Sequence, residues 1–554
     1  MILASSSSIK KFTQMGAWGD KTLIDYFKSH VKKDPERVCV IDPPNKEKLV
    51  GLPAERLTYR DLDRAADAVA EALVAEGIEK DDVVLVQLPN CWELAMLYQA
   101  VSRAGALISP LPVLWRESEM SYIAGLTKAR VLITIKQFNN FDHMAQAKSL
   151  QKKHPHIEKV FSLEDIRALS LGQIKQTLDS VTVDPNDIFT ICWTSGTEAN
   201  PKGCPLSHNN WAGMAKVQDV AGMRSGDVML TAGPLVNMAS IGTVYIPWTI
   251  LGGTLLLHHP FDPQVFMKQL MEEKPNYTLL VPALANMLVK HPNVDQFDLT
   301  SFRTITLGSA PPSLYTLQEF KRRWDIEIGN IWGQNEGTGI VSGIEDIPEM
   351  DCRVDHFPQW GKPGSIWSSS ASKVVEVKIL DDSGEELTEV GKVGELVYKG
   401  PGVIAEYYKN PTVTQRSFTK DGFFRTGDLF QIREGDCISF FERAKDIIIR
   451  GGYNISSQEV ENYLLSHPKV QEAAVVGMPD EKLGERMCAY VVPVPGQTVT
   501  FDELVCLLNE KGVARYKHPE RLEYLEQIPR NPVGKILKKQ LRKDLLSRMQ
   551  KDLA

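Results

Sequence analysis

The sequence predicts an α/β fold in which two helix-covered sheets are followed by a region of short strands and a small α+β domain. Three observations predict this order. Up to about residue 345, apolar strands alternate with helices of about 10 to 15 residues, which is typical of parallel sheets covered by helices. From about residue 370, the strands are short and separated by turns. Beyond that, about 100 residues mix helices and strands, which is an ordinary domain size.

The first block begins with two predicted helices, in residues 20–33 and 57–77. The second has apolar residues at helical spacing and ends at Gly77, a residue that often terminates helices. The pattern continues through a strand, a helix followed by a strand, and a further strand, in residues 81–90, 91–111 and 130–134.

A second block of the same kind runs from about residue 185 to 345, without a fixed-period repeat. Its first strand, residues 187–193, leads directly into the polar string TSGTEANPKG. Its other predicted strands are residues 252–258, 277–283, 302–308 and 326–333. Two similar blocks predict two stacked sheets.

Beyond residue 370, the Asp-Asp-Ser-Gly string at 381–384 predicts a hairpin turn. A boundary is expected near residues 442–454. After it, Ser456 or Ser457 is expected to cap a helix by accepting hydrogen bonds from its first amides. Two strands and another helix are then predicted in residues 470–480, 487–494 and 500–512.

The composition is that of an ordinary globular enzyme, with 554 residues, 43% hydrophobic, 24% charged and a net charge of −7. This charge does not favour nucleic-acid binding. The eight cysteines form no CxxC pair, so neither a zinc site nor a disulfide framework is indicated. We expect a soluble protein of the reducing cytoplasm, without an integral membrane segment.

The string TSGTEANPKG places backbone amides, three hydroxyls and Lys202 at the end of a strand. Such a cluster suits polyphosphate oxygens, because open α/β sheets bind ligands beyond the carboxyl ends of their strands. It is not the P-loop of kinases, since Gly203 follows the lysine where that motif has Ser or Thr. The alternative is an ordinary polar surface loop.

Three further strings carry candidate chemistry. WGQNEGTG holds Trp332, which can stack on a purine, and Glu336, which can bind Mg²⁺. RTGD holds Asp428, whose carboxylate can bind both ribose hydroxyls, and NPVGK presents Lys535 on a tight turn. Taken singly, each is more typical of a core tryptophan, a solvated acid, a turn or a surface lysine.

The order of these strings resembles the adenylate-forming superfamily of acyl- and aryl-CoA synthetases, adenylation domains and luciferases. The strings run in the family's order: TSGTEANPKG, GSAPP, WGQNE, GELVYKGPGVIAEYY, RTGD, ERAKDIIIRGGYNISSQEVE and NPVGK. The resemblance implies a large N-terminal domain, residues 1–444, of two stacked βα sheets plus a small β-barrel-like subdomain. A small, mobile α+β C-terminal domain, residues 445–554, then carries the adenylation lysine.

The resemblance implies activation of a carboxylic acid by ATP with Mg²⁺, giving acyl-AMP and pyrophosphate. The metal is expected at Glu336 and the Thr197 hydroxyl, and Lys535 at the substrate carboxylate. Nucleotide-binding residues are expected at Thr194, Ser195, Gly196, Lys202, Gly308, Ser309, Ala310, Trp332, Gly333, Asn335, Asp428 and Arg443. The acid pocket is expected to include Asn237, Met238, Gly308, Gly333, Thr338 and Gly339.

A second half reaction with coenzyme A is implied by rotation of the C-terminal domain. Lys445 matches the hinge position, and Gly451 and Gly452 are expected beside the pantetheine arm. No His-Asp dyad is needed, because the attacking carboxylate is already ionised and positioning with electrostatic stabilisation suffices.

Several positions depart from the family pattern. Glu198 and Ala199 replace a hydroxyl residue and a glycine, and Trp332 replaces a tyrosine. Asn335 stands where threonine is usual, and Asn237 stands where many members have histidine.

The sequence therefore predicts an AMP-forming acid–CoA ligase for a mid-sized apolar acid, aromatic, alicyclic or medium-chain, acting as a monomer or homodimer. The reaction direction stays open, as does loading of a separate carrier protein instead of coenzyme A. A non-catalytic sensor of adenylates or acyl-CoA is an alternative of another class, and the presence of Lys202, Glu336, Asp428, Arg443 and Lys535 argues against it. A luciferase-like oxygenase, which also begins with adenylation, is barely separated by sequence.

Overall fold

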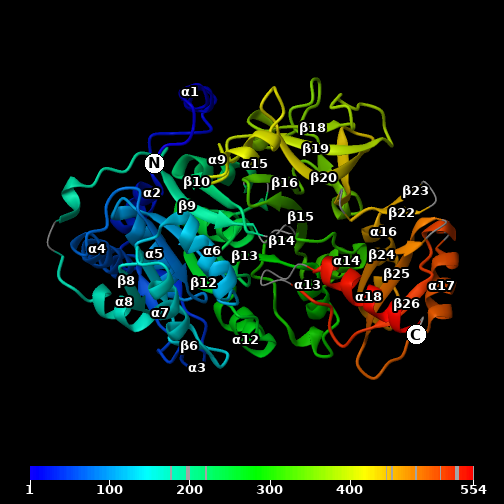
Figure 1. Ribbon diagram of the computed structural model, residues 1–554, viewed down its shortest axis with the longest axis horizontal. Coiled ribbons are helices and arrows are strands. Elements are labelled where there is room, and N and C mark those ends of the chain that lie inside the picture. Colours follow the sequence, from blue (N-terminus) through cyan, green and yellow to red (C-terminus); the bar gives the residue numbers. More distant parts are fainter. Residues whose placement is uncertain are drawn as a thin grey trace. The chain divides into compact units, whose positions relative to one another are not determined.

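The computed structural model describes residues 1–552, apart from residues 175–176, 195–199, 219–220, 444–445, 451–452, 481–482, 512, 514 and 531–535. The chain divides into two compact units (Figure 1). The first unit contains Met1–Val377 and Tyr398–Phe424, and the second contains Lys378–Val397 and Arg425–Ala554.

A six-stranded sheet of the first unit has the order β10-β9-β4-β3-β5-β8. Its strands are β3 (Val83–Gln87), β4 (Leu107–Pro110), β5 (Val131–Thr134), β8 (Lys159–Ser162), β9 (Ile188–Trp193) and β10 (Gly203–Ser207). All pairings are parallel except that of β10 with β9. Every residue of β3, β4, β5 and β9 is buried, which is typical of parallel strands covered on both faces.

An eight-stranded sheet of the same unit has the order β16-β15-β14-β13-β11-β12-β1-β2. Its strands are β1 (Val38–Ile41), β2 (Arg56–Thr58), β11 (Val228–Thr231), β12 (Thr254–Leu257), β13 (Tyr277–Leu280), β14 (Thr304–Gly308), β15 (Glu327–Gln334) and β16 (Thr338–Ser342). The inner strands are parallel, and the two edge strands, β2 and β16, run antiparallel to their neighbours.

The helices of this unit precede, connect or follow its strands (Figure 1). They are α1 (Ser6–Gln14), α2 (Leu23–Lys33), α3 (Lys46–Val50), α4 (Tyr59–Ala75), α5 (Trp92–Arg103), α6 (Glu117–Thr127), α7 (His143–Lys153), α8 (Leu163–Ser170), α9 (His208–Gln218), α10 (Met238–Ser240), α11 (Ile246–Leu251), α12 (Pro263–Glu273), α13 (Pro282–Val289), α14 (Leu314–Trp324) and α15 (Pro411–Arg416). A π-helical stretch, Ile241–Tyr245, joins α10 to α11. Three short strands complete the unit: β6 (Gln137–Phe138), β7 (Phe141–Asp142) and β17 (His356–Pro358).

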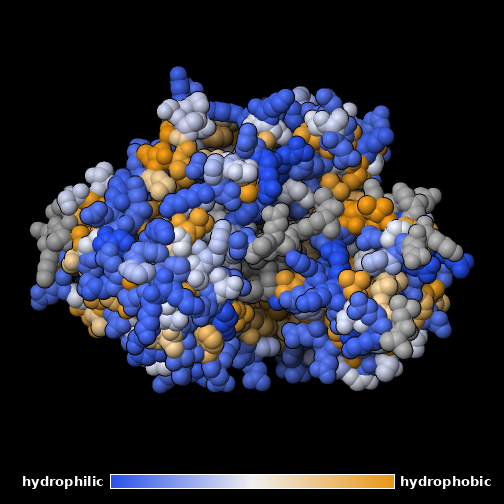
Figure 2. Space-filling view, viewed as in Figure 1, coloured by the Kyte–Doolittle hydropathy of each residue, from blue (hydrophilic) through white to orange (hydrophobic). Residues whose placement is uncertain are grey.

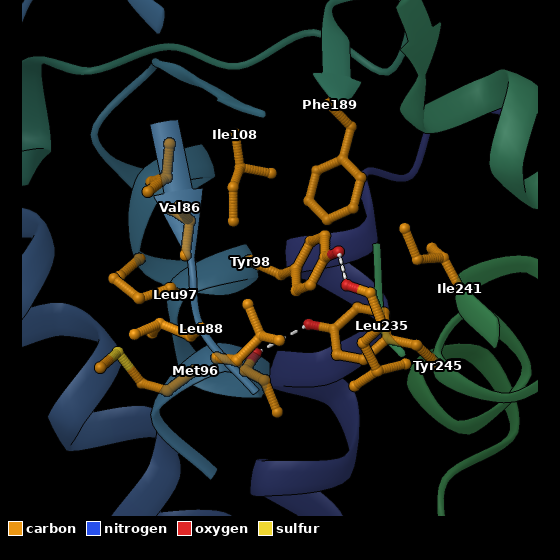
Figure 3. Packing of buried hydrophobic residues seen from close by; sticks show 14 of the residues in the cluster. Val86, Leu88, Met96, Leu97, Tyr98, Ile108, Phe189, Leu235, Ile241 and Tyr245 are labelled. Atoms are coloured by element: carbon orange, nitrogen blue, oxygen red, sulfur yellow. Dashed lines mark hydrogen bonds between the residues drawn. The ribbon is translucent and has the colours of Figure 1, made fainter. Parts of the chain in front are cut away.

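The two sheets share one hydrophobic core, which confirms the expected stacking. The core contains Val86 of β3 and Phe189 of β9 together with Leu255 of β12, and helices α4 and α5 contribute to it. All residues of α5 are buried, including the charged Glu93 and Arg103. Its Tyr98 hydroxyl donates to the Leu235 carbonyl oxygen at 2.7 Å (Figure 3).

The second unit begins with strands that continue across the division between the units: β18 (Glu376–Leu380), β19 (Val393–Lys399) and β20 (Phe424–Ile432). With β21 (Cys437–Arg443) they form a sheet in the order β21-β20-β19-β18. The rest of the unit contains β22 (Ile448–Arg450), β23 (Tyr453–Ile455), β24 (Val470–Asp480), β25 (Gly484–Pro493), β26 (Arg521–Tyr524), α16 (Ser457–Leu465), α17 (Phe501–Glu510) and α18 (Lys538–Asp552).

Successive residues of β24 pack into two different hydrophobic clusters of this unit. Val475 packs in a cluster with residues of α16 and α17. Val476 packs in another cluster with Leu541 and Leu545 of α18. Successive side chains of a strand point to opposite faces, so the sheet carries helices on both faces.

The structure corrects two expectations about the first unit. Residues 187–193, predicted as the first strand of the second block, form β9 and pair with β4 of the first sheet. The second sheet instead takes in β1, which was not predicted and pairs with β12. Apolar runs indicate that a strand is buried, but neighbours are chosen by packing of the whole chain.

The predicted helix cap is confirmed, whereas the predicted hairpin forms only its turn and one bridge. Ser456 Oγ accepts from the Glu459 amide at 3.2 Å and begins α16. The turn at 381–384 forms, with Gly384 at a φ of 88°. It is followed by a single bridge between Leu380 and Glu386 rather than by a second paired strand.

Hydrophilic residues cover most of the face shown in Figure 2, and the hydrophobic ones lie between them in separate groups. Within the part of the chain that the structure describes, no helix has both the length and the apolar character needed to cross a bilayer.

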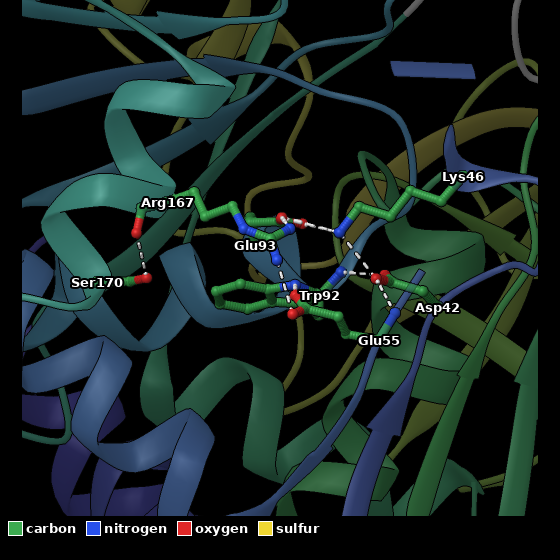
Figure 4. Close-up of polar contacts among 7 residues, drawn as sticks. All are labelled: Asp42, Lys46, Glu55, Trp92, Glu93, Arg167 and Ser170. Carbon is green, nitrogen blue, oxygen red and sulfur yellow. Dashed lines mark hydrogen bonds and ion pairs between the residues drawn. The ribbon is translucent and has the colours of Figure 1, made fainter. Parts of the chain in front are cut away.

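A buried ionic cluster joins the helices α3, α5 and α8 of the first unit to the residue that follows β1 and the residue that precedes β2 (Figure 4). The Lys46 ammonium is 1% exposed and lies 2.7 Å from Asp42 Oδ2 and 2.8 Å from Glu93 Oε2. Asp42 also accepts from the amides of Trp92 and Glu55, at 2.8 and 3.1 Å. Burial raises the pKa of Asp42, and the attraction of Lys46 opposes that shift. Arg167 of α8 donates to Glu55 at 2.6 Å.

Candidate functional site

The polar loop between β9 and β10 has its two ends joined by hydrogen bonds. The Thr194 amide donates to the Lys202 carbonyl oxygen at 3.0 Å, and the Lys202 amide donates to the Thr194 hydroxyl at 3.2 Å. These bonds continue the antiparallel pairing in which Trp193 lies opposite Gly203. The loop residues between them, Ser195, Gly196, Thr197, Glu198 and Ala199, lie outside the described residues.

Two predicted site residues, Lys202 and Glu336, contact the same phenol. The Tyr407 hydroxyl donates to Glu336 Oε1 at 2.7 Å. Lys202 Nζ lies 3.4 Å from that hydroxyl and 4.7 Å from the centre of the tyrosine ring. The structure therefore brings a cation and a carboxylate from distant strings to one point.

Sequence reasoning missed Tyr407. The residue belongs to the string GELVYKGPGVIAEYY, which supported the family resemblance but received no chemical role. The only sequence signal for Tyr407 was that it lies in one of the motif strings shared with the family. Its contacts with Lys202 and Glu336 depend on a fold that brings together residues 205 and 71 positions apart.

The surroundings keep Tyr407 protonated. Burial raises the pKa of its phenol well above the usual range, and the neighbouring Glu336 carboxylate raises it further. A protonated phenol donates one hydrogen bond and accepts others. Tyr407 can therefore donate to Glu336 while its oxygen accepts from Lys202.

The backbone around Glu336 is held by the segment that leads to Tyr407. The Ile404 amide donates to the Glu336 carbonyl oxygen at 3.0 Å. Next to the carboxylate, Gly337 has a φ of 84°, and a Cβ there would lie 1.8 Å from the Gly402 carbonyl oxygen. Only glycine fits such a close approach of two backbones, so this contact fixes the turn that carries Glu336.

Asn335 connects three parts of the candidate site. Its Oδ1 accepts from the Met238 amide at 2.9 Å, at the start of α10. Its Nδ2 donates at 2.9 Å to the carbonyl oxygen of Trp193, the last residue of β9 before the polar loop. Asn237 caps the same helix, since its Oδ1 accepts from the Ser240 amide at 3.3 Å. Two departures from the family pattern therefore act at one helix start.

The predicted adenine and acid residues lie at neighbouring strand ends of the eight-stranded sheet. Gly308 ends β14, and the exposed Ser309 and Ala310 follow it. On β15 and β16, Trp332 lies opposite Ile340 and Gly333 lies opposite Gly339. Thr338 is fully buried, and its hydroxyl has no hydrogen-bond partner among the described residues.

The remaining predicted residues belong to the second unit. Asp428 on β20 is buried, and its Cα lies opposite that of Arg443 on β21. The Thr426 hydroxyl accepts from the Asp428 amide at 3.2 Å. Lys445, Gly451, Gly452 and Lys535 lie outside the described residues.

Comparison with known proteins identifies the family. The pattern of the AMP-binding enzyme family matches residues 27–408, and that of the AMP-binding enzyme C-terminal domain matches residues 459–535. The chain is 30% identical to a medium-chain fatty-acid–CoA ligase of Escherichia coli strain K12, over 98% of this chain and 94% of that protein. It is 29% identical to a 2,3-dihydroxybenzoate-AMP ligase of Bacillus subtilis strain 168, over 97% and 96% of the two chains.

A solved structure shows the same fold. The crystal structure of ATP-bound MatB from Rhodopseudomonas palustris matches with a TM-score of 0.80 at 24% identity, over 95% of this chain and 99% of that chain. The family strings, the two matched regions and the shared architecture agree along nearly the whole sequence. This chain belongs to the AMP-binding enzyme family, the adenylate-forming superfamily.

Proposed function

We propose that this adenylate-forming ligase is an ATP-dependent carboxylic acid–CoA ligase that releases AMP. A carboxylate oxygen attacks the α-phosphorus of ATP, the bond to pyrophosphate breaks, and acyl-AMP forms. The sulfur of coenzyme A then attacks the acyl carbonyl, the bond to AMP breaks, and the thiol proton passes to solvent.

The observation that carries this proposal is the joint contact of Lys202 and Glu336 with Tyr407. Lys202 ends the loop that follows β9, and Glu336 follows β15. The carboxyl ends of strands are where open α/β sheets bind their ligands. A cation and a carboxylate held there suit the phosphates of a nucleotide and the metal that accompanies them.

Glu336 fits the magnesium ion that adenylate-forming enzymes typically use. It is a nearly buried carboxylate, and its Oε2 is not the oxygen that the phenol binds. Mg²⁺ favours oxygen ligands and usually binds one or two carboxylates together with substrate phosphates. We assign it to Glu336 and the Thr197 hydroxyl, where the bound ion supplies positive charge to the phosphates.

The other roles follow the family strings. Lys202 with Thr194, Ser195 and Gly196 binds the outer phosphates, and Trp332 stacks on adenine. Asp428 binds the ribose and Arg443 the ribose or phosphates, while Lys535 binds the substrate carboxylate. After rotation at Lys445, residues 451–452 line the path of the pantetheine arm.

We propose a mid-sized apolar acid as the substrate. Its pocket is formed by Asn237, Met238, Thr338 and the glycines at 308, 333 and 339, which are small or apolar apart from the amide and the hydroxyl. The names of two relatives, a medium-chain fatty-acid–CoA ligase and a dihydroxybenzoate-AMP ligase, support the range from medium chain to aromatic ring.

A second candidate is transfer of the acyl group to a separate carrier protein. The similarity to a salicyl-AMP ligase / salicyl-S-ArCP synthetase of Mycobacterium tuberculosis, at 29% identity, favours it. The acceptor chemistry differs only in what carries the thiol, so an assay with both acceptors distinguishes the two candidates.

The test is a panel of carboxylic acids in two assays. Acid-dependent exchange of pyrophosphate into ATP measures the first half reaction, and thioester formation with coenzyme A or with a phosphopantetheinyl carrier measures the second. We expect exchange with medium-chain or aromatic acids and thioester formation with coenzyme A, ranked by kcat/KM because this ratio measures discrimination. Exchange without any coenzyme A thioester favours the carrier candidate, and no exchange with any acid favours a sensor.

A further inference from the structure

We propose that Tyr407 is a positioning residue that keeps the Lys202 ammonium and the Glu336 carboxylate apart, so that both stay available to a nucleotide. The inference rests on the proposed function, because it concerns how this chain prepares its site for ATP. It assigns a purpose to a buried phenol that the family strings leave without one.

The contacts place the phenol between the two charges. Lys202 Nζ lies 3.4 Å from the Tyr407 hydroxyl, and that hydroxyl donates to Glu336 Oε1 at 2.7 Å. Opposite charges attract more strongly at a protein site with little water than in bulk solvent. A lysine has a long, flexible stem, so without the phenol it would reach the carboxylate and form a direct ion pair.

A direct ion pair would occupy both groups that the nucleotide needs. The Lys202 ammonium would no longer be free for phosphate oxygens, and its charge would offset that of the metal-binding carboxylate. The phenol avoids this because its oxygen accepts from one partner while its proton goes to the other. It binds only Oε1 of Glu336, so the second oxygen remains for another ligand.

Tyr407 is fixed from several directions and does not follow either partner. Its amide donates to the Thr414 hydroxyl at 3.0 Å, and its carbonyl oxygen accepts from the Asn410 amide at 3.0 Å. Its ring lies 6.5 Å from that of Phe424 and is almost completely buried. The raised pKa of the phenol is consistent with its role as a donor to Glu336.

The experiment measures ATP binding by calorimetry in EDTA, without metal or acid, so that turnover plays no part. We expect Tyr407→Phe to weaken ATP binding about tenfold, the effect of removing one charged contact with a phosphate. The double variant Tyr407→Phe with Glu336→Gln should bind ATP within about twofold of Glu336→Gln alone, since the neutral amide no longer captures Lys202. A loss that persists in the double variant, or no loss in Tyr407→Phe, overturns the proposal.

Tyr408→Phe is the matched control, because it removes the hydroxyl of the adjacent buried tyrosine. Its ATP affinity should equal that of the unchanged protein. If Tyr407→Phe does not fold, Thr414→Val tests the inference instead, because it removes the hydroxyl that accepts from the Tyr407 amide and so loosens the phenol. It should weaken ATP binding in the unchanged background but not in the Glu336→Gln background, and an equal effect in both backgrounds overturns the proposal.

The failure of this inference is distinct from failure of the proposed function. If the unchanged protein binds no ATP under these conditions or with added Mg²⁺, the proposed function fails. If it binds ATP and Tyr407→Phe binds equally well, only the role of Tyr407 fails.

Discussion

Asn335 and Met238 are joined by a hydrogen bond in which the asparagine Oδ1 accepts from the helix amide at 2.9 Å. The same side chain donates at 2.9 Å to the carbonyl oxygen of Trp193. One amide group therefore ties the residue before Glu336 to the start of α10 and to the strand that enters the polar loop. Asparagine offers both a donor and an acceptor in one planar group.

Asn335→Ala should impair acid activation by leaving the Met238 amide and the Trp193 carbonyl oxygen without this partner. An unpaired buried polar group costs about 1–3 kcal/mol. We expect kcat/KM for acid-dependent exchange to fall about tenfold or more, with a raised KM for the acid.

Asn330→Ala is the control for this prediction, because Asn330 lies on β15, the strand that leads to Asn335, and its side chain donates a hydrogen bond to the Val354 carbonyl oxygen. It should lower the melting temperature while leaving the KM for the acid unchanged. Equal KM values in the two variants would contradict a positioning role for Asn335.

Lys535→Ala should abolish pyrophosphate exchange and spare thioester formation from supplied acyl-AMP. The lysine is assigned to the step in which charge develops at the α-phosphate, where a positioned cation contributes most. Rates of the two half reactions are measured separately, with the exposed Lys539→Ala as the matched control. Parallel loss of both half reactions would speak against alternation of the C-terminal domain.

Lys46→Met should destabilise the first unit strongly, because it leaves the carboxylates of Asp42 and Glu93 buried without their cation. Breaking a buried pair costs about 3–5 kcal/mol. Urea unfolding measures the effect. Lys268→Met is the control, since its pair with Glu272 is exposed and 3.9 Å apart, and such pairs contribute about 0–1 kcal/mol. A similar loss of unfolding free energy in both variants would show that the buried cluster contributes no more to stability than an exposed ion pair.

His208 should make the protein less stable as the pH falls. Burial lowers the pKa of this histidine to about 4, and it accepts from the Leu23 amide at 3.1 Å. Between about pH 6.5 and 4 the unfolded chain binds a proton at this position that the folded chain does not. This difference removes stability with falling pH, by about 3 kcal/mol in total.

His208→Gln should therefore reduce the loss of stability between pH 6.5 and 4, as followed by urea unfolding at several pH values. Above about pH 7.5 the pH dependence of the two proteins should coincide, because the histidine is then neutral in both states. An unchanged slope in the acidic range would contradict this assignment.

Much of the fold follows from periodicity and local signals. Apolar strands alternating with amphipathic helices predicted a helix-covered α/β architecture, and Ser456 predicted a helix start through its own side chain. Which strands pair with one another was harder to predict from the sequence. The placement of residues 187–193 in the first sheet, and of β1 beside β12, results from contacts distant in sequence.

The sequence by itself determined the family, because the motif strings and their order along the chain can be matched without knowing how far apart they lie in space. It also singled out Lys202, Glu336 and Asn335 as residues of interest. The chemical roles of these residues, like those of residues 195–197 and of Lys535, stay predictions.

Only the tertiary structure decided that Tyr407 stands between Lys202 and Glu336, and that Asn335 reaches both Met238 and Trp193. The physical reason is that periodicity and capping act between near neighbours in the chain. A hydrogen bond between distant residues exists only once packing has brought its donor and acceptor within about 3 Å.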